Sequence, residues 1–484
     1  MLKPIATALI SALFTLAMFN ASVNAANKKN DLPEIGVVAS SAITLDKEVL
    51  IGDALMRQLR GQGPIIHDPL LDEYIQDIGN RLVAQADDVK FPYKFFILNS
   101  PDINAFAFFG GHIGIHTGLI FNAQNESQLA SVLAHEVSHV TQRHIARSIE
   151  ARKKSSPLQI ASLLGGLLLA MANPEAGIAT IYAGNAASAQ SSINYTRQNE
   201  KEADRIGIRI LAQAGFDPNG ASSFFGILTE KNRLKSKQLA FLQTHPLPES
   251  RVADARTRAA SYRVGNVPES LNFHLAKARV LARYYASPKR NTHYFSELVQ
   301  KERYVFKQAA QYGLALSYLA NEQLAEAQRL INELLKADPN NLFYLDTYTD
   351  IAIETKQRTK AIEKLTAQSI HTPYNQVITL NLANILIKDN QAEKAVALLK
   401  DYLLINPGKM LAYELLSDAY RVSEQKLEMH QVKAEIYALA AAYPRAIDEL
   451  HTAYNFANDR QIEKQRIRAR IDQFRGAQER LESL

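Results

Sequence analysis

The sequence of 484 residues contains no cysteine. Disulfide bonds are therefore excluded, and so is a lipid anchor on an N-terminal cysteine. Exported eukaryotic domains commonly depend on disulfides, so an exported chain without them favours a bacterial periplasm. Beyond its N-terminus, the chain also lacks an apolar run of about 20 residues, the length that a helix needs to cross a bilayer. Tryptophan is absent too, and 47% of the residues are hydrophobic, as in a globular protein.

The N-terminus has the composition of a signal peptide. Lys3 precedes an apolar run from Ile5 to Phe19, and Val23-Asn24-Ala25 is a small-x-small cleavage pattern. We therefore expect residues 1–25 to be removed on export to the periplasm. Their removal takes away one lysine and changes the formal net charge from +6 to +5. Such a small excess does not indicate a nucleic-acid partner, and it is compatible with peripheral contact at an anionic membrane surface.

The segment His135-Glu136-Val137-Ser138-His139 carries the pattern HExxH. Residues four apart on a helix lie on the same side, so both imidazoles can point at one metal ion. Glu136 lies beside the first imidazole, where its carboxylate can reach a water bound to that metal. A catalytic zinc takes three protein ligands and leaves a fourth position open. The pattern predicts a zinc peptidase site with one ligand still to be found, and the alternative is an amphipathic helix with two coincidental histidines.

The residues around this motif predict a stable helix. Asn125, followed three residues later by Gln128, has the spacing of an N-cap with its capping-box partner. Apolar residues then recur at helical spacing, and no proline or glycine interrupts residues 128–150. We expect this helix to be buried and stiff.

A second helix is predicted to start near Asn199 and to supply the missing ligand. On spacing alone, Glu200 and Glu202 are both candidates. Asp204 lies one turn after Glu200 and shares its face. A zinc-bound histidine needs an acceptor for its second nitrogen, usually a carboxylate, and Asp204 suits that task.

Two further segments allow a structural and a functional interpretation. The apolar stretch 160–172 predicts either a buried core helix or a lid or membrane-facing segment near the site.

Residues 108–116 alternate apolar residues and glycines, which predicts either an ordinary hairpin strand or an exposed edge strand. In the second case, Gly111, His112, Ile113, Gly114 and Ile115 would pair with an extended substrate. His112 and His116 share one face of this strand, but no acidic partner is evident for a second metal.

Several motifs together resemble a known peptidase family. HExxH followed about sixty residues later by Asn-Glu-x-x-x-Asp resembles the gluzincin arrangement. Residues 104–119, with NAFA and GGHIGIHTGL, are similar to the strand pair ahead of HExxH in HtpX-type and CAAX-prenyl endopeptidases. Residues 195–207, and Thr244-His245-Pro246 followed by Arg251, also fit this family. The resemblance covers roughly residues 40–262, and it departs at Phe109, where many relatives have proline.

This resemblance implies an α+β zinc-metallopeptidase domain, mostly helical with a small sheet. It implies one Zn²⁺ per chain, with His135, His139 and Glu200 as ligands and Glu136 as general base and then general acid. His245 would correspond to a latch that enters the open zinc position and keeps the enzyme latent. Alternatively, His245 or Arg251 could donate a hydrogen bond to the oxyanion of the tetrahedral intermediate.

The C-terminal half has a repeat of 34 residues. Three prolines occur at this spacing: Pro339, Pro373 and Pro407. An alanine stands twelve residues before each proline: Ala327, Ala361 and Ala395. A small residue stands twelve residues before each alanine: Ala315, Thr349 and Ala383. This phase is typical of tetratricopeptide (TPR) repeats, although the tryptophan and glycine of the consensus are missing. Isolated repeats cannot bury their apolar faces, so we expect an all-α TPR solenoid with a concave binding groove.

These features predict a signal peptide (1–25), a zinc-metallopeptidase domain (26–264) and a TPR domain (265–484). The combination resembles the periplasmic metalloprotease-chaperones of Gram-negative bacteria. That resemblance implies a role in outer-membrane β-barrel assembly, for example of the lipopolysaccharide-transport barrel LptD, and in cleaving misassembled protein. It also implies docking of the repeats on the barrel-assembly machinery. The alternative is a TPR-based chaperone or scaffold with a latent or vestigial peptidase site.

Overall fold

The computed structural model describes residues 43–151, 186–234, 238–263 and 265–482, and of residues 186–196 only the backbone. The expected signal peptide (1–25) and the apolar stretch 160–172 lie outside the described residues. Within these ranges the chain is mostly helical and contains one small sheet. None of the described helices is long and apolar enough to cross a membrane.

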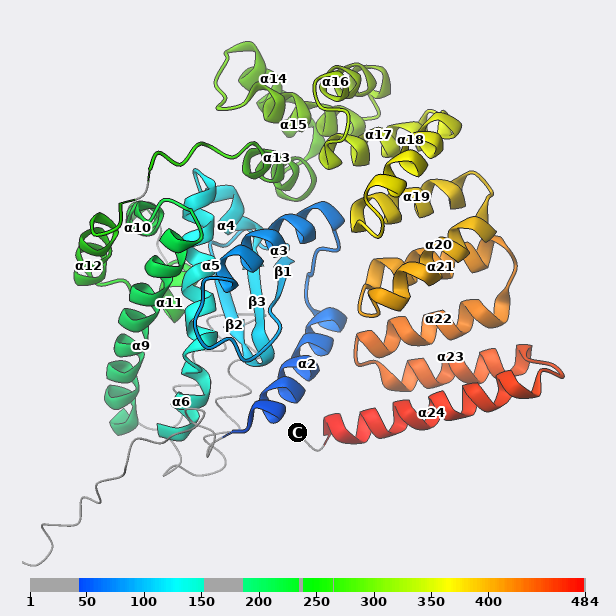
Figure 1. Cartoon of the computed structure of the whole chain (residues 1–484), viewed down its shortest axis with the longest axis horizontal. Helices are drawn as coiled ribbons and strands as arrows, with labels where there is room; N and C mark the ends of the chain where they lie inside the picture. Colours follow the sequence, from blue (N-terminus) through cyan, green and yellow to red (C-terminus); the bar gives the residue numbers. More distant parts are fainter. Residues whose placement is uncertain (1–42, 152–185, 235–237, 264, 483–484) are drawn as a thin grey trace, which may run out of the picture.

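The first part of the chain, residues 43–263, packs helices around the sheet, and we call it the N-terminal lobe (Figure 1). Its helices are α2 (Leu45–Gln62), α3 (Pro69–Val83), α4 (Thr117–Asn122), α5 (Glu126–Thr141), α6 (His144–Ala151), α9 (Ala186–Gln213), α10 (Asn219–Arg233), α11 (Ala240–Thr244) and α12 (Glu249–Ala260). The strands are β1 (Lys94–Leu98), β2 (Ala105–Phe108) and β3 (His112–His116), and a 3-10 turn, η1 (Phe109–Gly111), joins the last two.

The core of the lobe lies between the sheet and helices α3 and α5. Asp68 caps α3, and Pro69 follows at its first position, where a missing N–H costs nothing. The apolar face of α3 then packs on the sheet through side chains that are fully buried: Leu71, Ile75, Ile78 and Leu82. Burial of this face holds α3 and the sheet together as one support for α5.

The sheet has the order β1-β3-β2, with β1 parallel and β2 antiparallel to β3. Gly111–Ile115 was predicted as an exposed edge strand for the substrate, and that prediction was wrong. His112–Ile115 lie in the central strand, which is buried and paired on both sides, and Gly111 ends the turn before it. The alternating pattern identifies a strand but not its position in a sheet, which the pairing with β1 decides. Gly114 is needed at the centre, because a Cβ there would lie 2.5 Å from the ring of Phe106.

Helix α5 begins where the capping pattern predicts and ends earlier than expected. The Asn125 side chain accepts a hydrogen bond from the Gln128 N–H at 3.0 Å. The helix stops at Thr141, and Arg143 adopts a positive φ of 49° before α6 begins. The buried Arg143 guanidinium donates to Glu48 of α2 at 2.9 Å, which fixes this break between the two helices.

The second part of the chain is a succession of helices that we call the array. It comprises α13 (Leu271–Val280), a π-helical turn η2 (Leu281–Tyr285), α14 (Pro288–Gln300), α15 (Lys307–Ala320), α16 (Leu324–Ala337), α17 (Leu342–Glu354), α18 (Arg358–His371), α19 (Gln376–Lys388), α20 (Ala392–Ile405), α21 (Met410–Val422), α22 (Lys426–Leu439), α23 (Tyr443–Phe456) and α24 (Gln461–Glu482). It forms an arc beside the N-terminal lobe (Figure 1).

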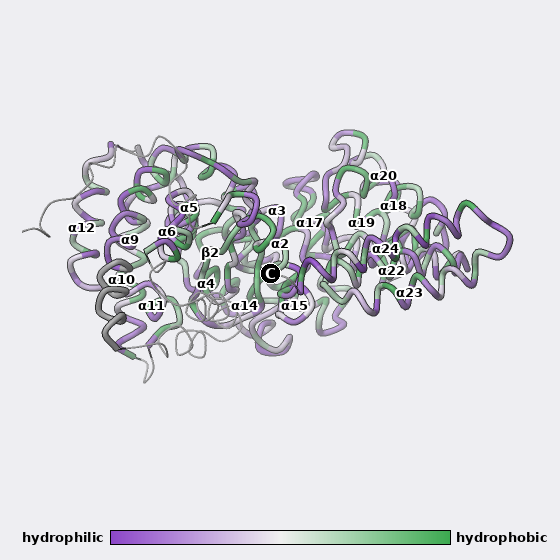
Figure 2. The backbone as a smooth tube through the Cα atoms, turned by 90° about the horizontal axis from the view of Figure 1, so that it is seen from below, coloured by the Kyte–Doolittle hydropathy of each residue, from purple (hydrophilic) through white to green (hydrophobic). Residues whose placement is uncertain are grey.

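The array follows the period found in the sequence. Helices α16, α18, α20 and α22 begin at residues 324, 358, 392 and 426, every 34 residues. Two residues before each of these helices the backbone has a positive φ, at Glu322, Lys356, Asn390 and Glu424. The small residues of the repeat are fully buried: Ala315, Ala327, Thr349, Ala361, Ala383 and Ala395. Hydrophobic and hydrophilic residues alternate along these helices, as expected where each buries one face (Figure 2).

A buried charge network joins the lobe to the array. Arg279 of α13 donates to Asp68 of α3 at 2.7 Å, to Asp346 of α17 at 2.7 Å and to the Tyr312 hydroxyl at 2.9 Å. Burial raises the pKa of Asp68, but the nearby Arg279 outweighs it and holds this pKa below its ordinary value. Removing one member of a buried ion pair typically costs about 3–5 kcal/mol, so this network couples the two parts strongly.

Between the two parts lies a cavity of about 870 Å³. Helices α2 and α3 and strand β1 line it on the lobe side, and the segment before α21 lines it on the array side. Its walls contain both signs of charge, including Arg60 and Asp72 of the lobe and Lys409 of the array, together with apolar side chains such as Phe95.

Candidate metal centre

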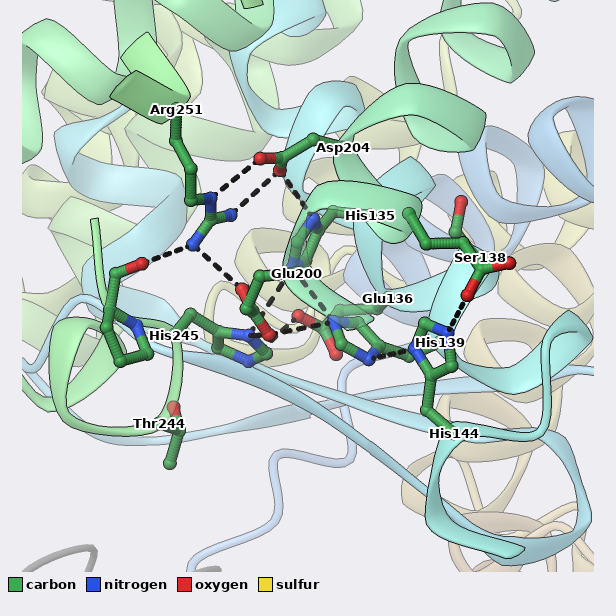
Figure 3. Close-up of polar contacts among 12 residues, drawn as sticks. His135, Glu136, Ser138, His139, His144, Glu200, Asp204, Thr244, His245 and Arg251 are labelled. Atoms are coloured by element: carbon green, nitrogen blue, oxygen red, sulfur yellow. Dashed lines mark hydrogen bonds and ion pairs between the residues drawn. The ribbon is translucent and has the colours of Figure 1, made fainter. Parts of the chain in front are cut away.

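The candidate centre lies where helices α5 and α9 pack against each other (Figure 3). Helix α5 carries His135 and His139, and α9 carries Glu200 and Asp204. Gly207 lets the two helices approach closely, because a Cβ at this position would lie 3.1 Å from the backbone nitrogen of His135. A residue without a side chain is therefore what allows Glu200 to reach the two imidazoles.

Four side chains converge on one point. His135, His139, Glu200 and His245 each present one possible ligand atom within 4.8 Å of the others, and this is the only such group among the described residues. The Nε2 atoms of His135 and His139 are 3.0 Å apart. The Glu200 carboxylate lies 3.4 Å from His135 Nε2 and 3.3 Å from His139 Nε2. Of the two candidate ligands, Glu200 is therefore the one that lies beside the imidazoles.

Asp204 contacts the other nitrogen of the first imidazole. Its Oδ1 lies 3.1 Å from His135 Nδ1, so this ring is held between two carboxylates. Burial lowers the pKa of His135, but hydrogen bonds to Asp204 and Glu200 outweigh it and raise this pKa to about 10. Asp204 thus lies next to the second nitrogen of His135, and its role in supporting a metal-bound ring stays a prediction.

Arg251 lies behind the cluster and holds both carboxylates. It donates to Asp204 through Nε at 2.7 Å and through Nη2 at 2.8 Å, and its Nη1 lies 2.8 Å from Glu200. Nη1 also donates to the Pro246 carbonyl at 2.6 Å. All three nitrogens of the guanidinium are therefore engaged with the cluster and with the loop that carries His245.

His245 enters the cluster from the loop after α11. Its Nδ1 lies 3.0 Å from Glu200 and 3.3 Å from His135 Nε2, and its Nε2 lies 3.5 Å from Glu136 Oε1. The ring stacks on Phe241 with 4.7 Å between centroids. His245 thus stands beside the carboxylate expected to act as a general base.

The donor set fits a divalent cation. Nitrogen and carboxylate ligands in a buried group of this size are typical of zinc. With its imidazoles neutral, as metal binding requires, the cluster has three formal negative charges on Glu136, Glu200 and Asp204 and one positive charge on Arg251, a balance of two negative charges. A divalent cation would neutralise this charge. The Nε2 atoms of His135 and His139, 3.0 Å apart, would both be available to hold such an ion.

Comparison with known proteins agrees with this geometry. Residues 69–259 match the model of peptidase family M48. The chain is 42% identical over 456 residues to the beta-barrel assembly-enhancing protease of Escherichia coli, which covers 94% of this chain and 93% of that relative. The chain belongs to peptidase family M48. It is therefore a metallopeptidase, and the cluster on α5 and α9 lies within the matched residues.

Two other relatives show how far the similarity extends. The beta-barrel assembly-enhancing protease of Yersinia pestis is 38% identical over 449 residues, 93% of this chain and 92% of that relative. The mitochondrial metalloendopeptidase OMA1 of Schizosaccharomyces pombe is 28% identical over 180 residues, 37% of this chain and 50% of that relative. The second relative shares only part of this M48 chain.

Sequence reasoning missed one residue beside the M48 site, His144. Its Nδ1 lies 2.9 Å from Nδ1 of His139, and its Nε2 lies 3.2 Å from Glu202. Burial lowers the pKa of His144 to about 2, so the ring is neutral. Glu202, the rejected ligand candidate, therefore contacts this histidine instead of the cluster. The pattern HExxHxxxxH in the sequence could have pointed to His144. In a straight helix, however, the His144 ring would be directed away from His139.

The histidines of the central strand form no second metal group. The Nδ1 atom of His112 is 3.0 Å from the Phe109 carbonyl, and its Nε2 is 3.5 Å from Asp53. His116 is buried, and burial lowers its pKa to about 4. The absence of further ligand groups holds for the described part of this M48 chain.

The helix contact at Gly207 gives a testable prediction. Gly207→Ala should force α9 away from α5 by a few tenths of an ångström, lowering both the affinity for added zinc and the thermal unfolding midpoint. Overpacking typically costs about 1–3 kcal/mol. Gly226→Ala in α10 is the matched control, since nothing lies within 4 Å of its added Cβ and alanine favours helix. Equal zinc affinity in the two variants would contradict the role of Gly207.

Proposed function

We propose that this M48 metallopeptidase is a zinc endopeptidase of the bacterial periplasm that assists and controls outer-membrane β-barrel assembly. The single observation that carries the proposal is the convergence of His135, His139 and Glu200 beside Glu136. The names of relatives aligned over more than nine-tenths of the chain support the cellular role.

In this proposal His135, His139 and Glu200 hold one Zn²⁺. Two imidazole nitrogens and one carboxylate are a common ligand set of catalytic zinc in peptidases. Asp204 orients His135 through its second nitrogen, and Arg251 orients both carboxylates. Because the Arg251 nitrogens are all engaged, we assign it to positioning and not to the oxyanion.

When bound, the ion supplies a water acidic enough to attack a peptide carbonyl near neutral pH. Glu136 is 1% exposed and lies next to His135 on α5. Its carboxylate takes the proton of the attacking water and delivers it to the leaving amine.

His245 acts as a latch in this proposal. Its ring lies within hydrogen-bond distance of Glu200, a proposed ligand, and close to Glu136. A fourth nitrogen donor at the cluster would take the position that the nucleophilic water needs. The loop is held by the hydrogen bond from Arg251 to the Pro246 carbonyl, so release of the latch requires this contact to break.

We propose that the chain divides into a signal peptide (1–25), a peptidase domain (26–264) and a TPR domain (265–484). The 34-residue period of helix starts supports TPR repeats in the array. We propose that the repeats dock on the barrel-assembly machinery; the relatives' names support the role in barrel assembly. The mixed charged and apolar walls of the 870 Å³ cavity suit a polypeptide segment better than a small apolar ligand.

Glu136→Gln should abolish hydrolysis of casein and leave zinc bound, because the amide cannot accept the proton of the water while the three ligands remain. Proteolysis is measured by fluorescence release and zinc by metal analysis of the purified chain. The matched control is Glu150→Gln in α6, outside the cluster. Turnover near that of the wild type in Glu136→Gln would defeat the assignment.

His245→Ala should raise proteolysis several-fold, because the variant frees the open position of the metal. The comparison is the initial rate of casein cleavage at saturating zinc for wild type and variant. His430→Ala in the array is the control, because it also removes a histidine that hydrogen-bonds a glutamate, but far from the cluster. Its rate should equal that of the wild type. A lower rate in His245→Ala would instead assign this ring to stabilising the transition state.

The cellular role is tested in Escherichia coli cells that lack their own relative. Expression of this chain should restore the fraction of folded outer-membrane β-barrels, measured by heat-modifiable migration on gels. If the array also acts as a chaperone, the Glu136→Gln variant should still restore barrel assembly. It should not restore the removal of misassembled barrels, which requires proteolysis. If Glu136→Gln performs both tasks, the alternative of a scaffold with a vestigial peptidase site is correct. If neither chain restores folded barrels, the proposed role in barrel assembly is wrong.

A further inference from the structure

The two histidines of the HExxH motif are supported in different ways. If His135 and His139 bind the metal through Nε2, each must carry its proton on Nδ1, and this N–H needs an acceptor. For His135 the acceptor is the Asp204 carboxylate at 3.1 Å. For His139 the atom in reach is another imidazole nitrogen, Nδ1 of His144 at 2.9 Å.

This contact determines the direction of a hydrogen-bond chain. His144 Nδ1 can accept from His139 only if its own proton is on Nε2. That Nε2 lies 3.2 Å from Glu202 Oε2, and Arg147 donates to the same oxygen at 2.8 Å. The chain therefore runs from His139 through His144 to Glu202, and each ring has one defined tautomer.

The break between α5 and α6 makes this chain possible. In a continuous helix, a residue five positions after His139 would point about 140° away from it. The positive φ of Arg143 turns the chain so that His144 returns to the same side. Arg143 is held in this turn by Glu48 of α2 at 2.9 Å and by the Ile43 carbonyl at 2.8 Å.

We propose that His144 is a positioning residue that orients His139 for metal binding, with Glu202 as the terminal acceptor. The inference rests on the proposed function, which makes His139 a zinc ligand. Sequence spacing presented Glu202 as a rival ligand, and the geometry assigns it to this support. Since His144 is 3% exposed and the Glu202 side chain is 27% exposed, Glu202 can be changed with less effect on the core than His144.

The test measures zinc affinity in the full chain by competition with a chromophoric chelator. His144→Met removes the acceptor and should raise the zinc Kd by about 10–100-fold. His144→Gln keeps an acceptor for His139 and a donor for Glu202, so its Kd should stay close to that of the wild type. Glu202→Leu should weaken zinc binding less than His144→Met, and Glu202→Gln should leave it nearly unchanged.

His430→Met is the matched control, because His430 also hydrogen-bonds a glutamate, Glu449 at 2.6 Å, in the array. Thermal unfolding of the metal-free proteins and the absorption spectrum of the Co²⁺-substituted chain separate altered coordination from altered folding. If His144→Met does not fold, Glu202→Leu decides the question.

Wild-type affinity in both His144→Met and Glu202→Leu would overturn the proposal. So would a His144→Gln variant that folds normally and binds zinc as weakly as His144→Met, because hydrogen bonding would then not be the cause. A wild-type chain that binds no zinc would instead refute the proposed metal site itself.

Discussion

The close packing of α5 against α9 is the constraint on which the site depends. At Gly207 the two backbones approach so closely that a single added carbon would lie 3.1 Å from the nitrogen of His135. This approach places Glu200 within 3.4 Å of both imidazoles and Asp204 behind the first. Both helices are fixed in turn, α5 by the sheet and α3, and α9 through Arg251 of α12.

The electrostatics of the cluster follow from this packing. Three carboxylates and one guanidinium are buried together with two histidines and next to the partly buried His139, and burial alone would disfavour their charges. Two of the three carboxylates have close partners, since Arg251 and His135 each contact both Glu200 and Asp204. With the imidazoles neutral, as metal binding requires, a formal charge of two remains and matches a divalent cation. The two histidines of the motif have different neighbours. The Asp204 carboxylate contacts His135, and the neutral His144 contacts His139.

The array is joined to the lobe by charges and not only by apolar contacts. Arg279 bridges Asp68, which also caps α3, and Asp346 of the array. Farther along the arc, Arg57 of α2 donates to the Ala438 carbonyl at the end of α22 at 2.9 Å. Helix α2 also holds Arg143 through Glu48. One helix of the lobe thus contacts both the far part of the array and the helix break behind His139.

Much of this could be predicted from the sequence, because it depends on local spacing. The HExxH pattern and the Asn125 cap placed helix α5, the four-residue spacing placed Glu200 and Asp204 on one face, and the 34-residue period placed the helix pairs of the array. The preference for Glu200 over Glu202 needed the family resemblance, since both are acidic residues at a helix start.

What the sequence by itself determined was therefore the candidate ligand residues and the periodic helices, which depend on local geometry. The tertiary structure alone decided which strand is central, since pairing with β1 depends on residues distant in sequence. It also decided where α5 ends, because Arg143 turns the chain in contact with Glu48, some 95 residues away. The position of His245 beside Glu136 depends on a loop 110 residues from His135, and no local pattern specifies such a long-range contact.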